Sequence, residues 1–273
     1  MKAKLGVARC SWRWFLALLA GYLTTVIAGV PFAWPFDYLM NAGAPEIEDP
    51  MRVPADGQRR VVVLQHGMWR SSLSLLRIER TLRAHGYEVH NLDYPSTRER
   101  IEQHAARLAA AVEQIHATGP VHELHFVGHS MGGLVIEQYL RSAEARPTTG
   151  CVYIAVPHHG ALLADLRKHW FLFRLAMGTA GALQLSPGDP LVQQAIPQPG
   201  RSGTIVGDLG EGNASIPGRD DGTVAVDEAT FDGATATIRL PFGHTRIAYD
   251  PVTAREVLHF LRTGAFATVG VVR

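Results

Sequence analysis

The sequence predicts an α/β fold in which a mostly parallel sheet is covered by helices on both faces. Short apolar or β-branched runs alternate along the chain with longer stretches whose apolar residues recur at helical spacing. Parallel strands need crossover connections, and right-handed crossovers place the helices on the two faces of the sheet. Several polar residues directly follow predicted strands, at the edge where such sheets bind their ligands.

Length and composition indicate one medium-sized globular domain with an appendage. The 273 residues are 47% hydrophobic, which is enough to bury a core, and the formal net charge is +1. Acidic and basic residues are spread along the chain, so the charge pattern gives no support to nucleic acid as a partner. The two cysteines, Cys10 and Cys151, lie in different contexts and predict neither a disulfide framework nor a metal site. No feature of the sequence requires a cofactor.

The first 40 residues predict a membrane anchor. Basic residues precede an uncharged stretch at 14–36 that is about as long as a helix needs to cross a bilayer. The positive-inside rule keeps the basic end in the cytoplasm, so we expect an inner-membrane anchor with the rest of the chain outside the cytoplasm. The alternatives are a cleaved signal, with a secreted or periplasmic product, and a helix buried in the globular domain. Residues 41–58 predict a linker, and 59–273 the globular domain.

Six runs predict the strands of the sheet. The first is a β-branched run at 61–65, which His66 and Gly67 end and which suits a strand buried on both faces. The others are expected at 87–94, 124–128, 152–156, 203–207 and 235–240. The intervening helices are expected at 73–86, 99–117, 130–140 and 252–262.

The motif GHSMGG at 128–133 places Ser130 between a predicted buried strand and a predicted helix. A serine on such a tight turn has a strained backbone, and the glycines around it let strand and helix approach each other closely. The turn exposes the hydroxyl, and the amino end of the helix faces the place where negative charge develops. We therefore expect Ser130 to be a nucleophile rather than a serine that only caps the helix.

A serine hydroxyl needs a base within hydrogen-bond reach and an acid that orients the base. For this type of turn the chain order is serine, acid, histidine, which favours His244 as the base. Asp221 is the expected acid, Asp220 stays open as an alternative, and Asp208 is a third candidate. The histidines less well placed to act as the base are His158, His159, His169 and His259.

Two backbone amides are needed to stabilise a tetrahedral oxyanion. We expect them at Met131, directly after the nucleophile, and at Met68, after the first strand. The residues beside these positions are expected to give supporting hydrogen bonds rather than chemistry, and they are His66, Gly67 and His129.

The segment 160–199 precedes the fifth predicted strand and is strongly apolar, with interleaved basic residues. It predicts either a lid or acyl-chain wall over the site, or a helix packed in the core. The sequence leaves both possibilities open.

From about residue 61 to 260 the chain resembles the bacterial lipase and esterase group of the α/β-hydrolase superfamily. The matching pieces are VVLQHGMWRSS, NLDYPST, VGHSMGGLV, AVPHHGA, DDGTVAV and FGHTRIAYDP. The resemblance implies an α/β-hydrolase catalytic domain that cleaves a small-molecule or lipid ester through an acyl intermediate on Ser130, with Asp221 as acid, His244 as base and Met68 at the oxyanion site. An acyltransferase, a thioesterase or a peptidase using the same triad is an alternative, as is a non-catalytic, membrane-tethered binding protein.

Overall fold

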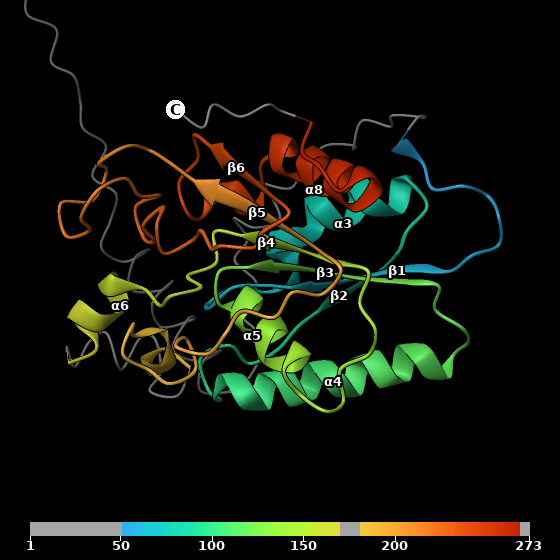
Figure 1. Cartoon of the computed structure of the whole chain (residues 1–273), viewed down its shortest axis with the longest axis horizontal. Helices are drawn as coiled ribbons and strands as arrows, with labels where there is room; N and C mark the ends of the chain where they lie inside the picture. Colours follow the sequence, from blue (N-terminus) through green and yellow to red (C-terminus); the bar gives the residue numbers. More distant parts are fainter. Residues whose placement is uncertain (1–50, 170–180, 268–273) are drawn as a thin grey trace, which may run out of the picture.

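The computed structural model describes residues 51–169 and 181–267 of the chain (Figure 1). Its centre is a six-stranded sheet in the order β2-β1-β3-β4-β5-β6, and every neighbouring pair runs parallel. The strands are β1 (Arg60–Gln65), β2 (Glu88–Leu92), β3 (Glu123–His129), β4 (Gly150–Ile154), β5 (Arg201–Gly207) and β6 (Ala236–Leu240). All six predicted strands are present, which confirms the α/β class and the parallel sheet.

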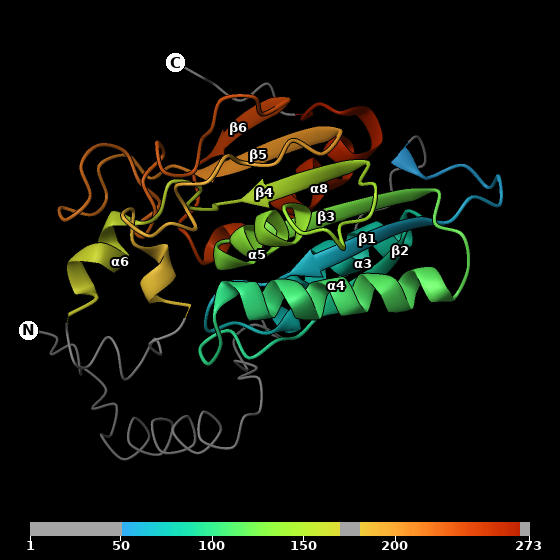
Figure 2. The same ribbon diagram turned by 60° about the horizontal axis from the view of Figure 1, so that its bottom comes forward.

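Helices cover both faces of the sheet, as Figure 2 shows. One face carries α4 (Ile101–Ala117) and α5 (Met131–Leu140), which pack on each other, and the opposite face carries α3 (Leu76–Ala84) and α8 (Pro251–Thr263). The shorter helices are α6 (Leu162–Arg167) and the 3₁₀ turns η2 (Ser72–Leu75), η3 (Leu183–Leu185) and η4 (Arg246–Ala248). Right-handed crossovers between parallel strands produce this layering.

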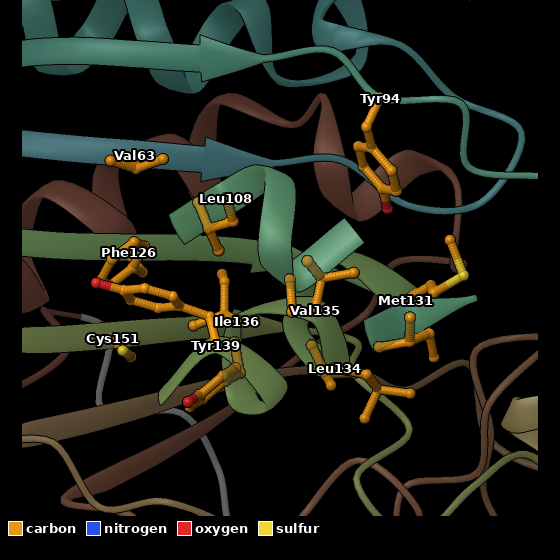
Figure 3. Close-up of a cluster of buried hydrophobic side chains, with 14 of the residues drawn as sticks. Val63, Tyr94, Leu108, Phe126, Met131, Leu134, Val135, Ile136, Tyr139 and Cys151 are labelled. Carbon is orange, nitrogen blue, oxygen red and sulfur yellow. The ribbon is translucent and has the colours of Figure 1, made fainter. Parts of the chain in front are cut away.

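The side chains of β1 point alternately to the two faces of the sheet, and this explains why the run from Val61 to Leu64 is apolar throughout. Val61 and Val63 pack under α4 and α5, whereas Val62 and Leu64 pack under α3 and α8. A strand covered on both faces gains from apolar residues at every position. Figure 3 shows part of the apolar cluster between the sheet and the helices α4 and α5. The ring centroids of Phe126 and Tyr139 lie 5.4 Å apart in it.

The end of β4 differs from the prediction, which continued the strand to residue 156. The strand ends at Ile154 because Ala155 takes a left-handed backbone, with a φ of 48°. The Ala155 N–H donates to the carbonyl of Ile205 at 2.8 Å, and the chain then turns toward Pro157. The apolar pattern was continuous across this turn because Ala155 and Val156 are also fully buried.

Residues 1–50 lie outside the described part of the chain, and with them the predicted anchor at 1–40 and most of the predicted linker at 41–58. Within 51–169 and 181–267 no helix has the length and apolar character needed to cross a bilayer.

Candidate active site

Ser130 lies in the turn between β3 and α5, and its backbone is strained. Its φ is 52° and its ψ −130°, a conformation that residues with a side chain rarely adopt. Glycine is required nearby because a Cβ on Gly132 would overlap the carbonyl oxygen of Gln65 at the end of β1. The Ser130 N–H donates to the carbonyl of Ile154 at 2.9 Å, so the end of β4 holds the turn in place.

Three predicted site residues from separate parts of the chain meet at this turn. The His244 Nε2 lies 3.0 Å from the Ser130 Oγ, and the His244 Nδ1 lies 2.7 Å from the Asp221 Oδ2. A carboxylate only accepts, so Nδ1–H donates to Asp221 and Nε2 is the atom that can accept the serine proton. This is the hydrogen-bond order that an activated serine requires.

Asp221 is held rigidly behind the imidazole. The carboxyl Oδ1 accepts from the N–H groups of Thr223 at 2.9 Å and Val224 at 2.8 Å, and the side chain is buried. The Asp221 carbonyl also accepts from the His244 N–H at 2.9 Å. Side-chain and backbone contacts therefore join the two loops that supply acid and base.

The other two candidate acids make different contacts. Asp220 faces its own loop, where it accepts from the N–H groups of Gly222 at 2.6 Å and Asn213 at 3.0 Å. Asp208 forms a salt bridge with Arg219 at 2.8 Å. Of the three aspartates, only Asp221 contacts the imidazole of His244.

The remaining candidate histidines are engaged away from Ser130 or exposed. His158 is buried, and its Nδ1 lies 2.5 Å from the Glu137 Oε1. The His259 Nδ1–H donates to the carbonyl of Ala265 at 2.8 Å. His159 and His169 are exposed.

The loop after β1 lies directly against the nucleophile turn. A Cβ on Gly67 would lie 3.1 Å from the Ser130 Cβ, so the glycine permits this close approach. Beyond it the chain turns sharply: Trp69 has a φ of 65°, and the Arg70 N–H donates to the Gly67 carbonyl at 3.2 Å. Among the described residues, neither the Met68 amide nor the Met131 amide donates to a protein acceptor.

His66 and His129 are buried beside the site, and each ring donates a hydrogen bond to a backbone carbonyl there. The His129 Nε2–H donates to the carbonyl of His244 at 2.9 Å, which fixes the backbone of that loop. The His66 Nδ1–H donates to the Gly67 carbonyl at 2.8 Å. Burial lowers the pKa of His66 to about 4 and the pKa of His129 well below its usual value, so both rings are neutral at neutral pH.

A cavity of about 420 Å³ opens at Ser130, a volume typical of small-molecule sites. The described parts of the segment 160–199 form one wall, through Leu163 and Ala164 of α6 and through Leu185. Residues 170–180 of that segment lie outside the described residues. Two arginines, Arg70 and Arg167, also line the cavity, and the sequence reasoning gave neither of them a role at the site.

Another residue that the sequence did not point to is Glu228, which links this wall to the Asp221 loop. Its carboxylate accepts from the N–H of Leu162, at the start of α6, at 2.6 Å and from the N–H of Ala225 at 2.8 Å. Burial raises the pKa of Glu228 above its usual value. No spacing pattern along the chain relates Glu228 to residues 66 positions away.

The alpha/beta hydrolase family matches this chain over residues 61–267, and the chain belongs to that family. The fold is similar to that of the lipase BlEst2 from Bacillus licheniformis in its mature form, with a TM-score of 0.58 and 18% identity over 77% of this chain and 94% of that one. It is also similar to the lin2722 gene product of Listeria innocua, with a TM-score of 0.55 and 16% identity over 78% of this chain and 97% of that one. A search of curated protein sequences gives no significant match.

Proposed function

We propose that this hydrolase cleaves carboxylic esters through an acyl intermediate on Ser130, with His244 as base and Asp221 as the acid that orients it. The hydrogen-bonded chain from Ser130 through His244 to Asp221 carries the proposal, because it gives the hydroxyl a base of the correct tautomer. The similar fold of a protein described as a lipase supports ester chemistry.

In the acylation step, the Ser130 Oγ attacks the ester carbonyl carbon while its proton moves to the His244 Nε2. The tetrahedral oxyanion accepts from the backbone N–H groups of Met68 and Met131, and the amino end of α5 adds a favourable field. The imidazolium then donates its proton to the leaving alcohol oxygen, and Asp221 stabilises the imidazolium. Water, deprotonated by the same Nε2, releases the acid in the second half of the reaction.

The cavity wall supports a substrate with an apolar acyl group. Leu163, Ala164 and Leu185 line it beside Ser130, so an acyl chain would replace water against apolar side chains there. We propose a small-molecule or lipid ester, with the described parts of the segment, residues 160–169 and 181–199, as the acyl wall. An N-terminal inner-membrane anchor that holds the catalytic domain outside the cytoplasm is part of the same proposal and would bring the site close to lipid.

Replacing Ser130 by alanine tests the nucleophile directly. We expect Ser130→Ala to lose at least 10³-fold in kcat on a short-chain nitrophenyl ester and to lose labelling by a fluorophosphonate, because both need the hydroxyl. Ser215→Ala is the matched control, since Ser215 is exposed and lies outside the cavity lining. Retained hydrolysis by the Ser130 variant would remove this residue from the mechanism.

The second nucleophile separates a hydrolase from an acyltransferase. Product analysis in water with an added alcohol acceptor should give the free acid as the main product. A non-catalytic member of the fold would give neither product and no labelling.

A further inference from the structure

We propose that Glu228 is a positioning residue that sets the acyl-chain preference of the site by holding α6, part of the apolar wall, against the loop that supplies Asp221. The inference rests on the proposed ester hydrolysis, because it concerns the acyl group that the same site accepts. Its basis is a contact in which the two oxygens of one carboxylate join segments that are far apart in the chain. In both ribbon views α6 lies beside the loops between β5 and β6 (Figure 1, Figure 2).

The carboxylate of Glu228 accepts a hydrogen bond from each of these segments. Its Oε1 accepts from the N–H of Leu162, the first residue of α6, at 2.6 Å, and its Oε2 accepts from the N–H of Ala225 at 2.8 Å. An N–H in the first turn of a helix has no carbonyl partner within the helix, so its acceptor comes from outside. Hydrogen bonds to a charged acceptor are about twice as strong as those between neutral groups. Glu228 therefore fixes the start of α6 to the loop that follows Asp221.

Apolar contacts join the same two segments beside the carboxylate. Leu163, the next residue of α6, forms a small buried cluster with Ala225 and Ile216. Leu163 also lines the cavity, and so does Val224 on the side of the acid loop. The hydrogen bonds of Glu228 and this cluster therefore set the separation of the two cavity walls between which an acyl chain would lie.

The triad has supports of its own, so the loss of Glu228 should affect the acyl group more than the chemistry. Asp221 accepts from two backbone N–H groups of its own loop, and the carbonyl of Ile154 holds the nucleophile turn. An acetyl group ends beside the serine, whereas a hexanoyl group extends further by four methylenes and would contact the wall. Each methylene buried against apolar side chains should raise kcat/KM about fourfold.

The test compares 4-nitrophenyl hexanoate with 4-nitrophenyl acetate, and its readout is the ratio of the two kcat/KM values. Glu228→Gln keeps the size of the side chain but replaces one acceptor oxygen by an NH₂ group, which cannot accept from the facing N–H. We expect wild type to prefer the hexanoate and the variant to lose about tenfold of that preference, as about two methylenes lose contact with a displaced wall. The loss should appear in KM for the hexanoate rather than in kcat.

Asp227→Asn is the matched control. Asp227 is the exposed neighbour of Glu228, carries the same charge and lies outside the cavity lining, so its replacement should leave the ratio unchanged. A variant that merely unfolds more easily would lower both rates together, which also leaves the ratio unchanged. The ratio therefore separates positioning of the wall from a general loss of stability.

A second pair of variants tests the same contact from the side of α6 and serves if Glu228→Gln does not fold. Leu162→Pro removes the N–H that donates to Glu228, and proline is tolerated at the first position of a helix. Leu162→Ala removes the side chain but keeps the N–H, and is the control for the proline variant. We expect the proline variant to have a ratio about tenfold lower than that of the alanine variant.

An unchanged ratio in Glu228→Gln would overturn the inference, as would an equal loss in Asp227→Asn or a wild-type enzyme that prefers the acetate. Should Glu228→Gln fail to fold, equal ratios in the two Leu162 variants would overturn it. Each of these results leaves the proposed esterase function standing, because ester is still cleaved at Ser130. Failure of the function itself would appear as no hydrolysis of either ester, or as hydrolysis that persists in Ser130→Ala.

Discussion

Replacing Asp221 by asparagine tests the hydrogen-bond order of the triad, because the new side chain has almost the same size and shape and differs only in one oxygen replaced by an NH₂ group. The Oδ1 of Asp221 accepts from two backbone N–H groups, which would favour the amide oxygen at that position. The amide NH₂ would then face the His244 Nδ1, now 2.7 Å from Oδ2. Because an NH₂ group donates, the imidazole would carry its proton on Nε2 and could no longer accept the serine proton.

The expected loss is large and specific to kcat. A wrong tautomer costs about 10⁴-fold in serine triads, or about 5.5 kcal/mol of transition-state stabilisation. The assay is steady-state hydrolysis of a nitrophenyl ester, with thermal unfolding to show that the variant is folded. Asp208→Asn is the matched control and should stay within a few-fold of wild type, because Asp208 pairs with Arg219 and not with the imidazole. An Asp221→Asn enzyme within tenfold of wild type would refute this assignment of the acid.

Two further predictions concern the buried histidines. His129→Leu removes the donor to the carbonyl of His244 and should lower kcat about tenfold with little change in KM. His129→Gln keeps an N–H donor and should recover part of this loss. Equal rates for the two variants would contradict the role of His129 in positioning the His244 loop. The pKa of His66 is lowered from 6.5 to about 4, so its contribution to stability is present above pH 6.5 and is lost as the pH falls toward 4. From pH 7 to pH 5 this contribution falls by about 2 kcal/mol, so urea unfolding of His66→Gln should show a pH dependence smaller by about that amount, and an equal pH dependence in the two proteins would argue against it.

The sheet could be predicted from the sequence because each strand leaves a local signal. A strand buried on both faces favours apolar residues, and β1, β3 and β4 are mostly apolar, although β3 also buries His125. The end of β4 could not be predicted, since the turn at Ala155 is itself buried and apolar. Burial sets the sequence pattern, and a change in backbone direction inside the core leaves that pattern unaltered.

The same distinction applies to the site. Ser130 is marked by its own neighbours, because the strained turn requires glycines at fixed positions around it. Asp221 and His244 follow from the chain order, but the choice among Asp208, Asp220 and Asp221 needed the structure. All three carboxylates accept from loop backbone N–H groups two residues further on, so the local sequence does not distinguish them.

The sequence contains no local pattern that identifies the residues of the cavity walls, although these walls contact the substrate. Arg70, in the loop after β1, and Arg167, at the end of α6, are distant in the chain and line the same cavity because the two segments border the same edge of the sheet. The nucleophile turn is held by β4 through the Ile154 carbonyl, and at Gly132 it packs closely against the end of β1, which leaves little freedom to adapt it to one ester rather than another. We therefore expect discrimination among esters to come from the cavity walls and not from the triad.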